Sequence, residues 1–191
     1  MKEELRRHGV VYGGYFLLVT LARLYSTRGF GGDFVGWLVV TTSMWFGGAL
    51  GYVLVFLDRL VYVYWLAPHE QLSQQVQYFL NKRDFWGVLG LIHRRRKEQI
   101  RLIFRSFLFI VAWVFLALFA LTSKSEIYAQ ALVLGLGLHL VYDLWRDQRS
   151  DPATLNQKLF WQVKRLVPMR IQRAFLYVFF GVFGWLTLFI V

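Results

Sequence analysis

The chain contains no cysteine and only three prolines in 191 residues. The absence of cysteine excludes disulfides, thiol catalysis and iron–sulfur ligation. Motifs for common chemistry are missing too: there is no Walker A loop, no G-x-S-x-G elbow and no H-E-x-x-H zinc helix. We therefore assign no catalytic residue, no metal site and no cofactor from motifs.

Acidic residues are also scarce, whereas apolar residues are abundant. The chain has 11 Asp and Glu against 22 Lys and Arg, and 57% of its residues are hydrophobic. A soluble fold of this size cannot hide that much apolar surface. In a bilayer, by contrast, the outer surface can itself be apolar. This composition predicts an integral membrane protein.

Five stretches are long and apolar enough to cross a hydrocarbon core, which takes roughly 20 residues. They are Gly9–Tyr25, Phe34–Leu57, Leu102–Leu121, Ile127–Trp145 and Ala174–Val191. No small-x-small cleavage site follows the first stretch, which favours an uncleaved span over a secretory signal. The sequence thus predicts an all-α integral membrane protein, a five-transmembrane-helix bundle that forms one domain over residues 1–191.

The basic residues are distributed unevenly between the two sides of such a bundle. With five spans, 19 of the 22 Lys and Arg fall on the side of the N-terminus, and only Arg23, Arg28 and Lys124 fall on the other. Lys and Arg concentrate in cytoplasmic connections. We predict a multi-pass protein of the cell (cytoplasmic) membrane, with its N-terminus inside, its C-terminus outside and an anionic inner leaflet as its lipid partner.

Two further helical elements are expected on the cytoplasmic side. Residues 68–101 predict a cytoplasmic helical hairpin, with a turn at Asn81–Asp84 and Asp84 as the cap of the second helix. No helix breaker follows, so we expect that helix to continue through residues 93–99 into the third span. Asp151 and Pro152 are typical of a helix start and predict an amphipathic helix over residues 152–167. This helix either lies in the membrane interface or docks on the hairpin, and the sequence favours the two equally.

One group of ionisable residues lies at the cytoplasmic ends of two spans. It comprises Asp58, Arg59, His139, Asp143 and Arg146. His139 and Asp143 are four residues apart and share a helix face. A His–Asp pair within a bilayer can relay protons or act as a base. The alternative is structural: an ion pair at the interface and a histidine bound to a backbone carbonyl.

His139 is the one histidine that we expect inside the membrane, because His8, His69 and His93 fall on the cytoplasmic side. One histidine does not suffice for a metal or haem site. We therefore predict no metal.

The remaining candidate residues are basic or small. Arg94, Arg95, Arg96 and Lys97 precede a span, and Lys164 and Arg165 lie on the amphipathic helix, so all six are predicted to contact anionic lipid rather than nucleic acid. Three small-xxx-small pairs predict close helix packing. These are Gly9 with Gly13, Gly47 with Gly51, and Ala131 with Gly135.

Three functions remain open on this basis. The first is a non-enzymatic scaffold, assembly or regulatory component that binds a membrane or cytoplasmic protein partner. The second is a small transporter or transporter subunit, with a polar path through Thr41–Ser43, Asp58, His139 and Asp143. The third is a membrane enzyme acting on a lipid, with His139 as base and Asp143 as its orienting group.

Overall fold

The computed structural model describes residues 2–27, 33–95, 99–123, 125–163 and 167–191. Within these ranges the chain forms helices and no strand, which confirms the all-α class. In chain order the helices are α1 (Lys2–Ser26), α2 (Phe34–Leu54), α3 (Leu57–Val61), the π-helix η1 (Tyr62–Leu66), α4 (Gln71–Asn81), α5 (Phe85–Arg94), α6 (Phe107–Thr122), α7 (Ile127–Ser150), α8 (Pro152–Phe160) and α9 (Met169–Thr187).

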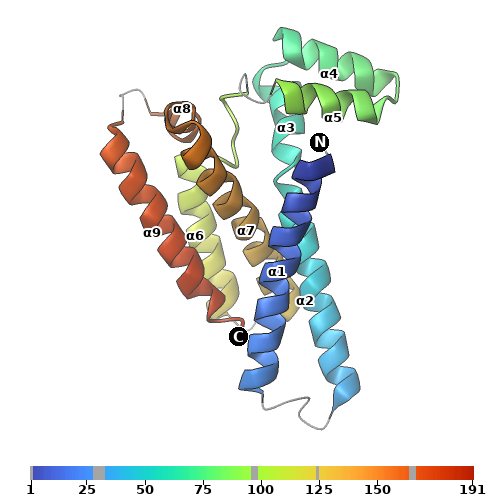
Figure 1. Ribbon diagram of the computed structural model, residues 1–191, viewed down its shortest axis with the longest axis vertical. Coiled ribbons are helices and arrows are strands. Elements are labelled where there is room, and N and C mark those ends of the chain that lie inside the picture. Colours follow the sequence, from blue (N-terminus) through green and yellow to red (C-terminus); the bar gives the residue numbers. More distant parts are fainter. Residues whose placement is uncertain (1, 28–32, 96–98, 124, 164–166) are drawn as a thin grey trace.

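The long helices α1, α2, α6, α7 and α9 run along the long axis of the molecule (Figure 1). Helix α7 is central and contacts α1, α2, α6, α8 and α9. The N-terminus, the α4–α5 hairpin and α8 lie at one end of the bundle, and the C-terminus lies toward the other (Figure 1). We call the end that carries the hairpin the hairpin end.

Two helical segments are long and apolar enough to cross a membrane. They are the continuous run Phe34–Leu66 and Ile127–Ser150, that is, α7. Helix α6 is equally apolar but has 16 residues, fewer than the roughly 20 that an upright span needs. Helix α1 begins at Lys2, so it includes the polar residues that precede the first apolar stretch at Gly9.

The interface between α2 and α7 is the most extensive in the molecule and depends on glycine. A Cβ added at Gly51 would lie 1.8 Å from the carbonyl oxygen of Leu132, and one at Gly47 would lie 2.3 Å from that of Tyr128. Gly135 meets the backbone of α2 in the same way. The predicted close packing at these glycines is confirmed.

The first small-residue pair behaves differently. A Cβ at Gly9 or Gly13 would meet nothing within 4 Å. The spacing predicts a close contact there, and that prediction is wrong, because this face of α1 does not pack against a neighbouring helix.

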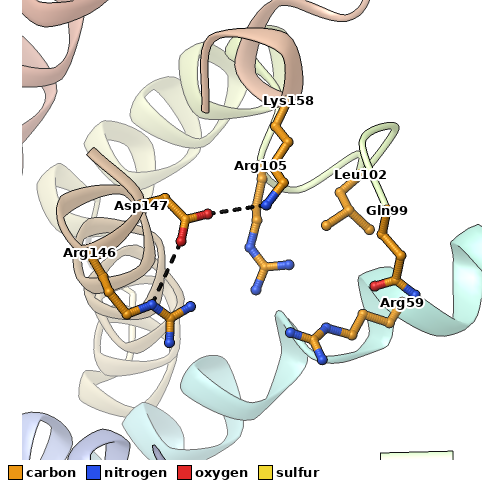
Figure 2. Close-up of a pocket in the computed structure, with 7 residues that line it drawn as sticks. All are labelled: Arg59, Gln99, Leu102, Arg105, Arg146, Asp147 and Lys158. Carbon is orange, nitrogen blue, oxygen red and sulfur yellow. Dashed lines mark hydrogen bonds and ion pairs between the residues drawn. The ribbon is translucent and has the colours of Figure 1, made fainter. Parts of the chain in front are cut away.

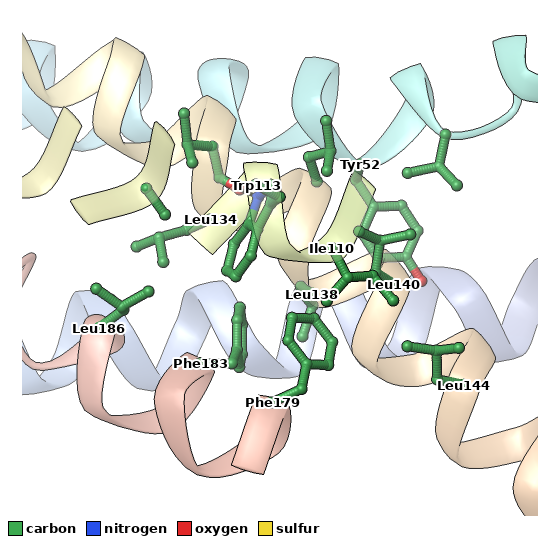
Figure 3. Close-up of a cluster of buried hydrophobic side chains, with 14 of the residues drawn as sticks. Tyr52, Ile110, Trp113, Leu134, Leu138, Leu140, Leu144, Phe179, Phe183 and Leu186 are labelled. Carbon is green, nitrogen blue, oxygen red and sulfur yellow. Dashed lines mark hydrogen bonds between the residues drawn. The ribbon is translucent and has the colours of Figure 1, made fainter. Parts of the chain in front are cut away.

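The apolar core surrounds Trp113 of α6, whose side chain is 1% exposed. Its indole Nε1 donates to the carbonyl oxygen of Val133 at 3.1 Å. Phe179 and Phe183 of α9 pack against the ring (Figure 3). Gly137 of α7 leaves space for it, since a Cβ there would lie 2.1 Å from the indole.

The predicted helix from the hairpin into the third span is interrupted in the described residues, and residues 96–98 lie outside them. Helix α5 ends at Arg94, and α6 begins only at Phe107. Ser106 is the N-cap of α6, and its hydroxyl accepts a hydrogen bond from the backbone N–H of Phe109 at 3.3 Å. A serine in this role marks a helix start. The apolar pattern of the sequence runs across this position and does not reveal the start.

Asp58 holds the non-helical segment that precedes α6. Its carboxylate accepts hydrogen bonds from the backbone N–H groups of Ile103 at 2.8 Å and Phe104 at 3.1 Å. In a continuous helix these N–H groups would bond to carbonyls four residues earlier. The buried carboxylate therefore replaces the helical partners and redirects the chain.

The hairpin has a small core of its own, separate from the core around Trp113. Leu72 and Val76 of α4 pack with Val88 and Ile92 of α5 and with η1. Asp84 caps α5 as predicted, by accepting from the backbone N–H of Gly87 at 2.8 Å. Phe85 and Leu89 of α5 remain exposed outside this core.

The helix that begins at Pro152 is shorter than predicted. Asp151 caps it by accepting from the backbone N–H of Thr154 at 3.1 Å, but the helix ends at Phe160 instead of reaching residue 167. Lys158 of this helix is buried. Helix α8 packs against α7 and α9.

We predict that Gly51→Ala destabilises the bundle by about 1–3 kcal/mol, because the new methyl group overlaps the α7 backbone. The matched control is Gly13→Ala, which we expect to be neutral or to stabilise by up to about 1 kcal/mol, since alanine favours helix where space is open. Both effects are measurable by reversible unfolding in mixed micelles, followed by circular dichroism. Equal losses in the two variants would contradict the packing described.

Candidate functional site

His139 and Asp143 lie next to each other on α7, toward the hairpin end, and both side chains are enclosed. His139 is 0% exposed and Asp143 is 2% exposed. His139 Nε2 lies 3.4 Å from Asp143 Oδ2. His139 Nδ1 lies 2.6 Å from the carbonyl oxygen of Tyr52. A carbonyl can only accept, so Nδ1 carries a hydrogen and the ring orientation is fixed by α2.

Two arginines hold the Asp143 carboxylate. Arg105 donates to Oδ2 through Nε at 3.0 Å and also through Nη2. Arg146 Nη2 lies 3.0 Å from Oδ1. Both carboxylate oxygens are thus engaged by guanidinium groups, and the carboxylate is not available as a base.

Arg105 was not among the predicted cluster residues, although it is the main partner of Asp143. From the sequence, Arg105 is predicted to be one of the cytoplasmic cations near the start of the third span. One signal points to its role: a buried arginine in an apolar stretch needs a carboxylate partner, and Asp143 is the acidic residue within the fourth span.

His8 also joins this cluster, although the sequence places it apart from His139. Its Nδ1 lies 2.9 Å from the hydroxyl of Tyr52, and its ring centroid lies 5.0 Å from that of His139. His8 precedes the first apolar stretch, and burial lowers its pKa from 6.5 to about 4. Its imidazole is therefore neutral at pH 7 and adds no charge to the cluster.

His8, His139 and Asp143 offer ligand atoms that lie within 4.8 Å of one another. Three such residues can hold a metal ion in principle. Here the guanidinium groups of Arg105 and Arg146 already occupy the carboxylate and would repel a divalent cation. The arrangement fits a structural charge cluster better than a metal centre.

Further ion pairs connect α1 and α8 to α7. Arg146 Nη1 donates to Glu4 Oε1 of α1 at 2.6 Å. Lys158 Nζ of α8 lies 3.3 Å from Asp147 Oδ2 of α7. Lys158 is 4% exposed, so it needs the carboxylate as a partner. The cluster therefore extends across α1, α7, α8 and the segment before α6.

A small cavity of about 10 Å³, roughly the space that one water molecule needs, lies beside these ion pairs. Its lining residues come from α3, the segment before α6, α7 and α8 (Figure 2). They are Arg59, Gln99, Leu102, Arg105, Arg146, Asp147 and Lys158. The predicted cluster members Arg59 and Arg146 thus share a cavity, whereas Asp58 binds the chain before α6 and His139 faces α2.

The predicted lipid-contact residues are described only in part. Arg94 is exposed at the end of α5, and its Nε donates to the carbonyl oxygen of Gly90 at 3.3 Å. Arg95 Nη1 donates to Gln75 Oε1 of α4 at 3.4 Å. Arg96, Lys97, Lys164 and Arg165 lie outside the described residues.

Comparisons with known proteins identify no relative of this chain. No protein-family model matches the chain, and neither a curated protein nor a solved structure matches it. The function is therefore argued from the residues of this chain alone.

We predict that Arg105→Gln lowers the free energy of unfolding by about 3–5 kcal/mol, because it leaves the buried Asp143 carboxylate without its main partner. The control is Arg7→Gln, which breaks an exposed pair with Glu3 and should change the free energy by less than about 1 kcal/mol. Denaturant unfolding of both variants measures the difference. If Arg105→Gln costs no more than Arg7→Gln, the cluster does not hold the helices together.

Proposed function

We propose that the chain is a five-span protein of the cell membrane with its N-terminus inside and its C-terminus outside. Support comes from the outer surface of the long helices, where large apolar side chains are more than half exposed. Examples are Leu18 at 68%, Phe46 at 67%, Phe119 at 72% and Val178 at 64%. Such surfaces are stable against lipid and would aggregate in water.

The arrangement of the helices supports the same topology. The N-terminus, the hairpin and α8, which the basic residues assign to the inside, all lie at the same end of the bundle (Figure 1). Helix α6 can serve as a span despite its length, because a short hydrophobic helix is accommodated by local thinning of the bilayer.

Within this topology, we propose that the hairpin docks a protein partner and that the protein is a non-enzymatic scaffold, assembly or regulatory component. The observation that carries this is a set of large apolar side chains on α4 and α5 that the hairpin's own core leaves exposed. It comprises Tyr78, Phe85, Trp86 and Leu89, which are 54%, 63%, 73% and 49% exposed. We call these residues the hairpin surface. Large aromatic side chains supply most of the binding energy at protein interfaces.

Charges beside the hairpin surface indicate the kind of partner. Lys82 and Arg83 form the exposed turn between α4 and α5, and Arg94 is exposed at the far end of α5. Lys82 Nζ lies over the ring of Tyr78 at 4.5 Å. A partner with an apolar centre and an acidic rim complements this surface.

The transporter and lipid-enzyme functions receive less support from the same geometry. Both require the carboxylate of Asp143 to be reachable by a solute, a proton path or a lipid. It is 2% exposed and bound by two guanidinium groups. His139 is likewise enclosed and bonded to a backbone carbonyl. This pattern favours a structural role for the pair.

We predict that Phe85→Ser with Trp86→Ser abolishes binding of the partner while leaving the fold intact, since both side chains are exposed. The loss should exceed tenfold, because each interface aromatic contributes roughly 2 kcal/mol or more. The matched control is Tyr25→Ser, which changes an aromatic residue that is 89% exposed at the opposite end of α1.

The measurement is native mass spectrometry of the protein extracted gently from its own membrane. The wild-type chain and Tyr25→Ser should carry a stoichiometric acidic protein, and the double variant should not. A wild-type chain that carries no protein, or a double variant that retains it, would contradict docking by the hairpin.

A further inference from the structure

The small cavity at the hairpin end is polar on nearly every side. All of its lining residues except Leu102 carry a charge or an amide. Figure 2 shows Gln99 on one wall, Asp147 on the opposite wall and the guanidinium of Arg105 between them. At about 10 Å³ the cavity has the space that one water molecule needs. Its size therefore limits the occupant to a single very small molecule.

The charges around the cavity are already balanced. Each of its four cationic side chains lies beside a carboxylate. The pairs are Arg59 with Asp58, Arg105 with Asp143, Arg146 with Glu4, and Lys158 with Asp147. A further ion of either sign would leave an uncompensated charge in a buried place, which is costly. The occupant that suits this cavity is therefore neutral.

Gln99 shows which hydrogen bonds the occupant must supply. Its side chain is 0% exposed and lines the cavity. Neither its Oε1 nor its Nε2 has a hydrogen-bond partner in the described part of the chain. Buried side-chain amides are nearly always bonded to protein or to ordered water. Because an amide both accepts and donates, it suits a partner that does both as well.

We propose that the cavity binds one structural water molecule, bonded to the amide of Gln99 and to Nη1 of Arg105. Water is neutral, fits the volume, and both donates and accepts. The bonds of Arg105 to Asp143 use its Nε and Nη2, and Nη1 offers two further N–H donors. Buried waters of this kind bridge polar groups that the fold itself does not join.

The water completes the bonding of the non-helical segment that precedes α6. Gln99 and Arg105 both belong to this segment, and Asp58 binds it at Ile103 and Phe104. The water joins Gln99 to Arg105, and Arg105 in turn binds Asp143 of α7. The segment is thus fixed at both of its ends as well as in the middle. This role is independent of the hairpin surface and of any protein partner.

The first test is the thermal unfolding midpoint of Gln99→Leu, measured on the full chain in nanodiscs of phosphatidylcholine. Leucine has nearly the size of glutamine but cannot bond to water. We expect the midpoint to fall by about 2–4 °C, because Nη1 of Arg105 and the water lose a partner. If the amide has no partner in the native protein, leucine instead removes an unsatisfied polar group and raises the midpoint. The sign of the shift therefore decides between the two.

The second test detects the water directly, through proton NMR contacts between water and the side-chain amides of glutamine. Gln172 is the matched control, because it is also 0% exposed. Its Nε2 donates to Oε1 of Gln148 at 2.8 Å and to the carbonyl oxygen of Pro152 at 3.3 Å. We expect a water contact at the amide of Gln99 and none at the amide of Gln172.

The proposal is overturned if Gln99→Leu raises the unfolding midpoint or leaves it unchanged. It is also overturned if the amide of Gln99 shows no contact with water. An equal contact at Gln172 overturns it too, since the signal would then come from general exchange with solvent. Both tests use the protein without a partner, so a failure of docking at the hairpin surface does not affect them.

Discussion

The carboxylate of Asp143 is the group on which the hairpin end of the molecule depends. It is buried on the central helix α7 and takes one arginine from the segment before α6 and another from α7 itself. The second arginine also reaches Glu4 of α1. Because breaking a buried pair of this kind leaves an uncompensated charge, the elements it joins cannot move apart independently.

Close packing of α2 on α7 positions Tyr52 beside the two histidines of this cluster. Glycines on both helices let the two backbones approach, with Gly51 against the carbonyl of Leu132 and Gly135 against that of Gly48. The approach brings the Tyr52 carbonyl to His139 and the Tyr52 hydroxyl to His8. Both histidines are therefore held by Tyr52 of α2, and both rings are enclosed within the bundle.

The sequence predicts the features that depend on local pattern. The apolar stretches, the cap at Asp84, the start at Pro152 and the shared face of His139 and Asp143 all follow from spacing along the chain. It does not predict the break before α6, because the reason for it, Asp58, is 45 residues away from Ile103. The sequence does not place Arg105 and His8 in the cluster for the same reason. Their partners come from other helices, and spacing along the chain does not predict which helices pack together.

In the proposed topology, the hairpin end faces the cytoplasm and the turn between α6 and α7 faces outward. The chain has no cysteine. A single introduced cysteine is therefore the sole site of labelling, and its labelling shows on which side of the membrane it lies. Asn81→Cys in the hairpin turn, Ser150→Cys at the end of α7 and Glu126→Cys at its start are all exposed positions. We expect a membrane-impermeant maleimide to label Glu126→Cys in intact cells and to label the other two only after permeabilisation. Labelling of Asn81→Cys or Ser150→Cys in intact cells, with Glu126→Cys protected, would contradict the proposed topology.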